Sequence, residues 1–167
     1  MTSRSVRCEK LHECEEAVNS EGVKCMGYEI FTDEWAVAWR DELNRSERYK
    51  KVGRTWEWPL VLLMEADPDW GIDQDRAVYV DLYHGECREA RVATADDIKQ
   101  VSYVVKADPK TWRDLRDGSI EAIGAMLRGR MVLQKGSMLV MARYVGAANE
   151  LTHAVSRINT VFPQEIA

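Results

Sequence analysis

The chain has 167 residues, of which 46% are hydrophobic and 31% charged, and its formal net charge is -5. This length suits one folded domain with short extensions, because a second domain would lack the sequence to build its own core. The acidic balance argues against duplex nucleic acid as a partner, since binding its phosphates requires a basic face.

The sequence also lacks the patterns of export or membrane insertion. No apolar run approaches the roughly 20 residues that cross a bilayer, and residues 1–19 are too charged for a secretory signal. Residues 164–167 do not match a peroxisomal address of the Ser-Lys-Leu type. Four cysteines, three of them near the start, do not form the framework of a small secreted domain. We therefore expect a cytoplasmic protein with reduced thiols.

The first third of the sequence predicts two helices. Apolar residues at three-to-four spacing predict a short helix over 5–19, followed by a connection to the main body. A stronger amphipathic helix is predicted from Thr32 to just before Gly53, with Thr32 or Asp33 as its N-cap. Its apolar stripe recurs every fourth residue: Phe31, Trp35, Trp39 and Leu43. Two tryptophans on one stripe must pack against something large, either a sheet or a ligand.

The middle of the sequence predicts four strands. The continuous apolar run over 59–65 is typical of a strand covered on both faces. Alternation over 77–83, turn residues, and a further run over 87–94 predict a hairpin. A second alternation predicts a strand over 98–107. One side of this last strand would carry Val101, Tyr103 and Val105.

The remainder predicts helices and one edge strand. In chain order, the helices cover 109–117, 119–129 and 138–158, with the strand at 131–134 before the last helix. Asp108 followed by Pro109 is typical of a helix start, and Gly118 and Gly129 would end the two short helices. Gly146 and the alanines after it would either kink the long helix or let another backbone approach closely. Together the elements predict an α+β layer with one sheet face covered by helices.

Residues 108–142 carry a more specific pattern. Its marks are Asp108-Pro109-Lys110-Thr111-Trp112-Arg113-Asp114-Leu115, then Gly118, then Ala125-Met126-Leu127-Arg128-Gly129-Arg130-Met131, then Gly136-Ser137-Met138. This order and spacing resembles the second half of sterol carrier protein-2 domains, which run through a Thr-Trp helix start, a Ser-Gly-Lys-Leu turn, an alternating strand and a Gly-Asp-Met or Gly-Asn-Met helix start. The first half matches only in the order of its elements, so the resemblance covers roughly 31–161.

Three features depart from the family pattern. The stretch between Gly129 and Gly136 is one residue longer, which predicts a bulge. Ser137 replaces the usual acid or amide, and the tail beyond Ala142 is longer. These departures affect the end of the predicted tunnel rather than the fold.

The resemblance implies a stand-alone α+β domain. Its expected architecture is a five-stranded, mostly antiparallel sheet with helices covering one face, and an apolar tunnel between them that holds a fatty acid, fatty acyl-CoA or sterol. We accordingly divide the chain into an N-terminal appendage and connection (1–30), a lipid-binding domain (31–162) and a C-terminal tail (163–167).

The resemblance also implies a lipid-binding lining and a head-group rim. The lining candidates are aromatic, aliphatic and thioether side chains: Trp35, Trp39, Trp112, Met126, Leu127, Met138, Met141 and Val145. Methionine adapts to irregular apolar shapes, although ordinary core packing explains the same stripe. The rim candidates are Arg128, Arg130 and Arg143, which would meet a carboxylate or a CoA phosphate, or else form solvated helix faces.

Other chemistries lack the residues that they need. The early cysteines and His12 do not form the two close pairs of a zinc site, and the acidic residues of 67–75 lack the glutamate of an EF-hand. Neither His84 nor His153 belongs to a recognisable triad. No Gly-rich phosphate loop follows a strand. We therefore expect no metal, no cofactor and no catalytic residue.

Two functions from different classes fit the sequence. The first is non-catalytic binding and transfer of an apolar lipid, because burying an acyl chain stabilises a complex by about 0.8 kcal/mol per methylene. The second is an accessory or oligomerisation module for a lipid-metabolising enzyme. The expected ligand is a lipid or acyl-CoA, while transient membrane contact, a homodimer and a partner enzyme stay open.

Overall fold

The computed structural model describes residues 27–166 in full and the backbone of 18–19 and 22–23. The helix predicted over 5–19 lies outside the described residues except at its end. There Val18–Asn19 (β1) pairs antiparallel with Gly22–Val23 (β2), so this end is a short strand rather than a helix.

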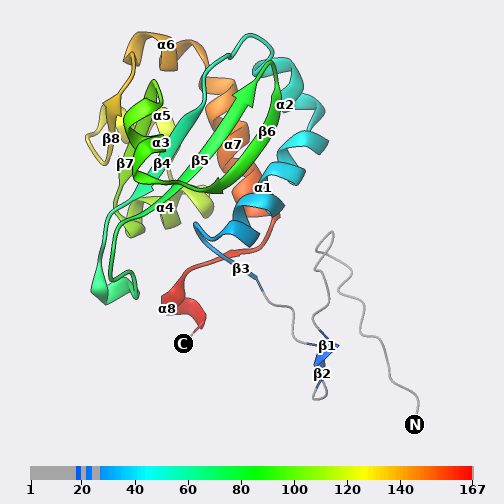
Figure 1. Cartoon of the computed structure of the whole chain (residues 1–167), viewed down its shortest axis with the longest axis vertical. Helices are drawn as coiled ribbons and strands as arrows, with labels where there is room; N and C mark the ends of the chain where they lie inside the picture. The colour runs from blue at the N-terminus through cyan, green and yellow to red at the C-terminus, as the bar shows by residue number, and fades with distance from the viewer. Residues whose placement is uncertain (1–17, 20–21, 24–26, 167) are drawn as a thin grey trace.

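The described body continues from residue 27 (Figure 1). Its strands are β3 (Tyr28–Glu29), β4 (Leu60–Met64), β5 (Arg76–Tyr83), β6 (Glu86–Val92), β7 (Tyr103–Ala107), β8 (Met131–Lys135) and β9 (Thr160–Val161). Its α-helices are α1 (Asp33–Arg45), α2 (Glu47–Val52), α3 (Ala95–Gln100), α4 (Pro109–Arg116), α5 (Ala122–Leu127), α6 (Met138–Arg143), α7 (Val145–Arg157) and α8 (Pro163–Ile166). A short 3-10 helix, η1 (Pro68–Trp70), lies between β4 and β5.

Five strands form one mixed sheet in the order β6-β5-β4-β7-β8. Neighbouring strands are antiparallel except for β4 and β7, which are parallel. The predicted mostly antiparallel sheet is therefore confirmed, with β8 at one edge. Its pairing with β7 shifts register between Leu133 and Lys135, so the bulge predicted from the extra residue is present.

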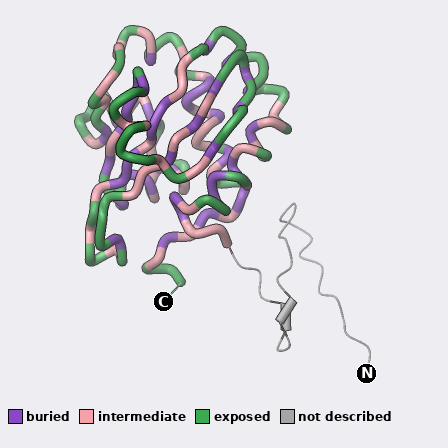
Figure 2. Tube along the Cα trace, viewed as in Figure 1, coloured by how far each residue is buried: buried purple, intermediate pink, exposed green. Residues whose placement is uncertain are grey.

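Side chains of the strands alternate between the two faces of the sheet. Val78, Val80 and Leu82 of β5 belong to the large core on the face covered by α1, α4 and α7. In Figure 1, α1 and α7 lie behind the sheet, and in Figure 2 buried residues concentrate between these layers. Val61 and Val104 face the other way, into a smaller cluster against α3. The helices thus cover mainly one face, as predicted.

Local sequence signals set several helix starts. The Thr32 hydroxyl accepts a hydrogen bond from the amide of Trp35 at 3.3 Å, and the Asp108 carboxylate accepts one from that of Thr111 at 2.7 Å. The Ser137 hydroxyl caps α6 in the same way. Each oxygen satisfies an amide that the first helical turn leaves without a partner.

Two predicted helices are each divided in the structure. Ser46 ends α1 and caps α2, because its hydroxyl accepts the amide of Tyr49. The helix predicted over 138–158 breaks at Tyr144, two residues before the expected kink, where the Tyr144 hydroxyl donates to the Thr55 carbonyl. Gly146 lies inside α7, close to Val52.

The strand predicted over 98–107 is also wrong in its first half. Residues 95–100 form α3, which begins with a capping box: the Thr94 hydroxyl accepts the Asp97 amide, while the Asp97 carboxylate accepts the Thr94 amide. Val101 ends this helix and packs with Val61 and Val104, not on the side of Tyr103 and Val105. The helix predicted from Ser119 likewise begins later, at Ala122.

Strands β3 and β9 close the body. They run parallel, with Tyr28 opposite Thr160 and Glu29 opposite Val161. Ile30, which follows β3, is almost fully buried in the core. The domain boundaries predicted at residues 30 and 162 stay a prediction. The structure shows that the segments next to these boundaries contact the core.

Candidate functional site

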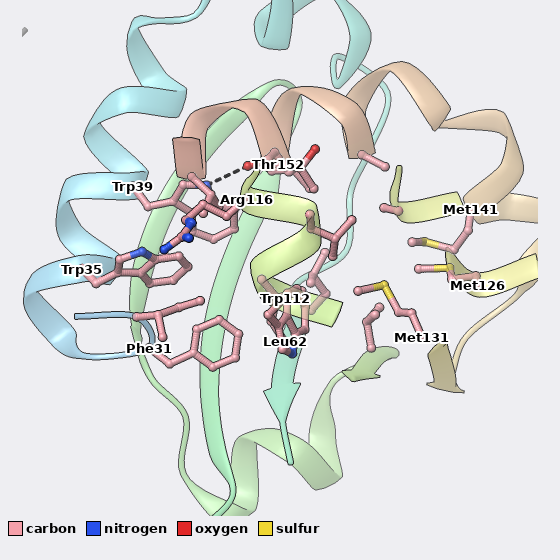
Figure 3. Close-up of a pocket in the computed structure, with 18 residues that line it drawn as sticks. Phe31, Trp35, Trp39, Leu62, Trp112, Arg116, Met126, Met131, Met141 and Thr152 are labelled. Carbon is pink, nitrogen blue, oxygen red and sulfur yellow. Dashed lines mark hydrogen bonds between the residues drawn. The ribbon is translucent and has the colours of Figure 1, made fainter. Parts of the chain in front are cut away.

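A cavity of about 70 Å³ lies between the helix-covered face of the sheet and helices α1, α4, α5, α6 and α7 (Figure 3). All but two of its lining residues carry apolar or aromatic side chains. The lining consists of Ile30, Phe31, Trp35, Trp39, Leu60, Leu62, Val105, Trp112, Leu115, Arg116, Ala122, Met126, Met131, Met141, Ala148, Leu151, Thr152 and Val155. Such a site is suited to an apolar guest.

Aromatic rings form one end of the cavity. The rings of Trp35 and Trp39 stack with centroids 5.3 Å apart, because four residues separate them on α1. Phe31 lies against both Trp35 and Trp112, with centroid distances of 5.3 and 5.2 Å. These contacts fix the rings as a rigid wall.

Each tryptophan in this wall uses its indole N–H inside the protein. The N–H of Trp35 donates to the Thr160 hydroxyl at 2.8 Å. The N–H of Trp39 donates to the Leu151 carbonyl at 3.0 Å, drawn as a dashed line in Figure 3, and that of Trp112 donates to the Leu63 carbonyl at 3.2 Å. The wall therefore presents apolar ring surface to the cavity.

Three methionines form the other end. Met126, Met131 and Met141 come from α5, β8 and α6, and their side chains converge in Figure 3. Met131 was not among the predicted lining residues, although it belongs to the family pattern and begins the predicted edge strand. Unbranched thioether side chains repack easily, so this end can change shape at lower cost than the aromatic wall.

The structure brings together five of the eight predicted lining residues: Trp35, Trp39, Trp112, Met126 and Met141. Leu127 does not line the cavity, since it ends α5 with 75% of its surface exposed. Val145 is also exposed. Met138 packs against the core but outside the cavity lining. Whether any of the eight contacts a lipid stays a prediction.

Several lining residues were missed from the sequence. Leu60, Leu62 and Val105 point from the sheet into the cavity. The period of two along each strand could have placed them on the helix-covered face. Arg116 and Thr152 carry no comparable signal, because each looks like an ordinary polar residue of an amphipathic helix.

The predicted rim arginines differ in their surroundings. Arg130 forms an ion pair with Asp114, with Nη2 and Oδ2 2.7 Å apart. Arg128 and Arg143 are exposed, and neither has an ion pair with any residue of 27–166. None of the three arginines lines the cavity, so the rim stays a prediction.

Asp114, the partner of Arg130, also binds two other basic side chains. It accepts hydrogen bonds from Arg130, Lys110 and Arg113. The hydrogen bond from Arg130 is the main reason that the pKa of Asp114 falls to about 2, from an ordinary value of 3.8. The pair links α4 to the segment between α5 and β8.

We predict that Asp114→Asn lowers the free energy of unfolding by about 1 kcal/mol at pH 7, a value reduced for solvent screening. A carboxyl group whose pKa is lower in the folded state stabilises the fold above its unfolded pKa and loses this effect as pH falls through its folded pKa. The difference between variant and parent should therefore shrink as pH falls below about 4. Urea unfolding at pH 7 and at pH 3 measures it, and a constant difference would contradict the prediction.

A buried carboxylate, that of Glu150, joins helices α1, α2 and α7. Glu150 of α7 accepts the Ser46 hydroxyl at 2.7 Å and Arg157 at 3.0 Å, with Arg48 and His153 nearby. Burial raises the pKa of Glu150, but the hydrogen bonds from Ser46 and Arg157 reverse this effect and hold the pKa below its usual value. Glu150 thus fastens α7 to the junction of α1 and α2.

Within the described part of the chain, no group of three or more His, Cys, Asp or Glu side chains could hold a metal ion. The cysteines and His12 of the first 25 residues lie outside the described residues. None of the helices in the described part is both long and apolar enough to cross a bilayer.

The fold and cavity together define a class of protein: an α+β domain in which helices enclose an apolar cavity against one face of a mixed sheet. A crystal structure of sterol carrier protein 2 is 37% identical with a TM-score of 0.70, covering 77% of this chain and 98% of that chain. A solution structure from Thermus thermophilus, of a conserved hypothetical protein described as a candidate sterol carrier protein, is 35% identical with a TM-score of 0.71, covering 81% of this chain and 95% of that chain. No protein-family model matches the sequence, and no curated protein does. The chain belongs to the sterol carrier protein 2 family.

Proposed function

We propose that the protein binds an apolar lipid reversibly in the cavity and transfers it without catalysis. The observation that carries this proposal is a continuous lining of aromatic, aliphatic and thioether side chains between the sheet and the helices. The family to which the chain belongs, and the chain's similarity to sterol carrier protein 2, support lipid binding. A fatty acid, a fatty acyl-CoA or a sterol would each supply the apolar body that this lining accepts.

Binding requires the cavity to enlarge. Its volume of about 70 Å³ is well below the roughly 300 Å³ or more of ordinary ligand pockets. We expect the methionine end to open, since Met126, Met131 and Met141 lie on three separate elements and repack easily. Burying about ten methylenes would supply on the order of 8 kcal/mol to offset this rearrangement.

The surface beside the methionine end suits contact with a donor or acceptor membrane. Leu127 and Leu139, on α5 and α6, expose 75% and 82% of their surface. Leu127 follows the cavity residue Met126, and Leu139 lies two residues before Met141. The exposed Arg128 caps the end of α5, and the exposed Arg143 ends α6. Exposed leucines next to cations are suited to anionic lipid headgroups. We expect this contact to be transient and the location of the protein to be cytoplasmic.

The same exposed leucines favour the alternative function, an accessory or oligomerisation module. Apolar side chains at this exposure could instead be covered by a second copy of the chain or by a partner enzyme. An oligomer that carries no lipid, and takes up none, would favour the alternative over lipid transfer.

Native mass spectrometry followed by a titration tests the proposal. We expect lipid to copurify with the protein. After delipidation, hexadecanoate should change the tryptophan fluorescence, because Trp35, Trp39 and Trp112 line the cavity. Isothermal titration calorimetry should show saturable heat. A delipidated, folded protein that shows neither a spectral change nor heat would contradict lipid binding.

A further inference from the structure

A polar hollow of about 430 Å³ opens at the protein surface, apart from the apolar cavity. It lies where β4 and β7, the parallel pair of the sheet, both end: Glu65 follows β4, and Asp108 follows β7. Ligands of open α/β sheets commonly bind outside the carboxyl ends of parallel strands. Six of the nine lining residues carry polar or charged side chains, and none of the nine lines the apolar cavity. The hollow is therefore a separate site of different chemistry.

Thr111 of α4 brings a buried hydroxyl to this hollow. The residue is 1% exposed, and its hydroxyl has no hydrogen-bond partner among residues 27–166. The hydroxyl is not sealed from solvent, so its access to a partner is through the hollow that Thr111 lines. Buried hydroxyls in proteins are normally hydrogen-bonded, because leaving one unmet is costly. The hydrogen bond of Thr111 must therefore come from the hollow.

Two charged groups of the lining keep unused hydrogen-bonding capacity. Within the described part of the chain, the Arg130 side chain donates a single hydrogen bond, from Nη2 to Asp114 at 2.7 Å. A guanidinium has five N–H groups, so the other four remain available. Asp108 accepts the Thr111 amide through Oδ1, while its Oδ2 has no donor among residues 27–166. The hollow thus offers both a cation with unused donors and a carboxylate with an unused acceptor.

A second pair of opposite charges lies in the same lining. Lys106 Nζ and Glu65 Oε1 are 2.7 Å apart, and their side chains are 29% and 44% exposed. Such an exposed ion pair contributes little stability, so either group can take another partner at low cost. Among the described residues, the two cations of the lining balance its two acids. Electrostatic complementarity therefore favours a ligand that carries both charges over a simple anion or cation.

We propose that this hollow binds a compact zwitterion, of which an α-amino acid is the simplest form. The carboxylate of the ligand accepts hydrogen bonds from Arg130 and from the Thr111 hydroxyl, and its ammonium donates to Asp108. Val132, with 52% of its surface exposed, gives an aliphatic side chain of the ligand an apolar contact in the same lining. The site is independent of lipid binding, since it shares no lining residue with the apolar cavity.

Titration of the full-length protein with L-valine, followed by NMR of the backbone amides, tests this assignment. The amides of Thr111 and Gly129 should shift saturably, with a dissociation constant in the millimolar range. Two matched ligands each carry only one of the charges: isovalerate lacks the ammonium, and isobutylamine lacks the carboxylate. Each should bind about tenfold more weakly than valine or worse, because it loses charge-assisted hydrogen bonds.

Two variants test the residues of the site. Arg130→Gln should weaken valine binding by about tenfold. Thr111→Val replaces the hydroxyl with a methyl group of similar size, so it should weaken valine binding several-fold without lowering the melting temperature. Lys110→Gln is the matched control, because Lys110 binds Asp114 as Arg130 does but lies outside the lining. Valine binding by this control should equal that of the parent.

Three binding results overturn the assignment: no saturable shift in the parent, binding of isovalerate or isobutylamine as tight as that of valine, and parent-like valine binding by either variant. A lower melting temperature of Thr111→Val also overturns it, because the hydroxyl would then have a partner in the fold. If Arg130→Gln fails to fold, Thr111→Val decides alone. Hexadecanoate binding tests the apolar cavity separately, so the two proposals can fail independently.

Discussion

Replacing Met141 with arginine is expected to abolish fatty acid uptake while leaving the protein folded. Met141 is 8% exposed, lines the methionine end of the cavity and lies on the short helix α6. A guanidinium placed there would fill the space of an acyl chain or draw water into it, and removing a charge from water costs several kcal/mol. Fluorescence titration with hexadecanoate should show no saturable change.

Leu139→Arg is the matched control for this experiment. Leu139 lies on the same helix but 82% of its surface is exposed, so an arginine at this position should leave equilibrium binding intact. Circular dichroism and thermal melting report whether each variant folds. If Met141 serves only as core, Met141→Arg should unfold the protein. A folded Met141→Arg variant that binds like the parent would place the ligand elsewhere.

Gly136→Ala is expected to destabilise the fold by about 3 kcal/mol or more, through a strained backbone and an overpacked core. Gly136 has φ of +119°, a conformation that side chains disfavour. An added Cβ would also lie within van der Waals overlap of the Tyr103 ring, and that ring is held against Trp56 and Trp58. The neighbouring rings leave Tyr103 no easy way to retreat.

Gly118→Ala separates these two causes. Gly118 also has a positive φ, of 75°, but a Cβ there would meet no atom within 4 Å. Its substitution should therefore cost only the backbone strain, about 1 kcal/mol. Urea unfolding of both variants measures the difference. Equal losses at the two positions would show that the contact with Tyr103 adds nothing.

The sequence predicted the elements whose signals are local. Asp108 before Pro109 marked the start of α4, and the alternation over 77–83 predicted β5. These signals depend only on neighbouring residues, so contacts with distant parts of the chain do not change them. The motif over 108–142 then supplied the family, which the structural relatives confirm.

The errors arose where contacts between distant segments decide the structure. Ser46 ends α1 while donating to Glu150 of α7, more than a hundred positions away. Helix α3 is a different case, because its capping pair Thr94 and Asp97 is a local signal, whereas the predicted strand rested only on the alternation that follows this pair.

The same reasoning explains the partial success with the candidate site. Periodicity found Trp35, Trp39 and Met141, because a stripe on a helix must face the core. It wrongly extended the cavity to Leu127, since a six-residue helix ends before its stripe can be covered. Arg116 could not be found this way, because the segment that surrounds it, 160–165, is distant in sequence.

The pairing of β3 with β9 has a consequence for biosynthesis. Because the ribosome releases the chain from its N-terminus, Tyr28 emerges long before Thr160, its partner. The aromatic end of the cavity, where Trp35 also binds Thr160, cannot be closed until that late segment has left the ribosome. Contacts between distant parts of a chain form slowly and leave apolar surface uncovered in the meantime. The nascent chain therefore displays its tryptophan-rich surface until Thr160 has been synthesised, and chaperones are the natural protection against aggregation during that interval.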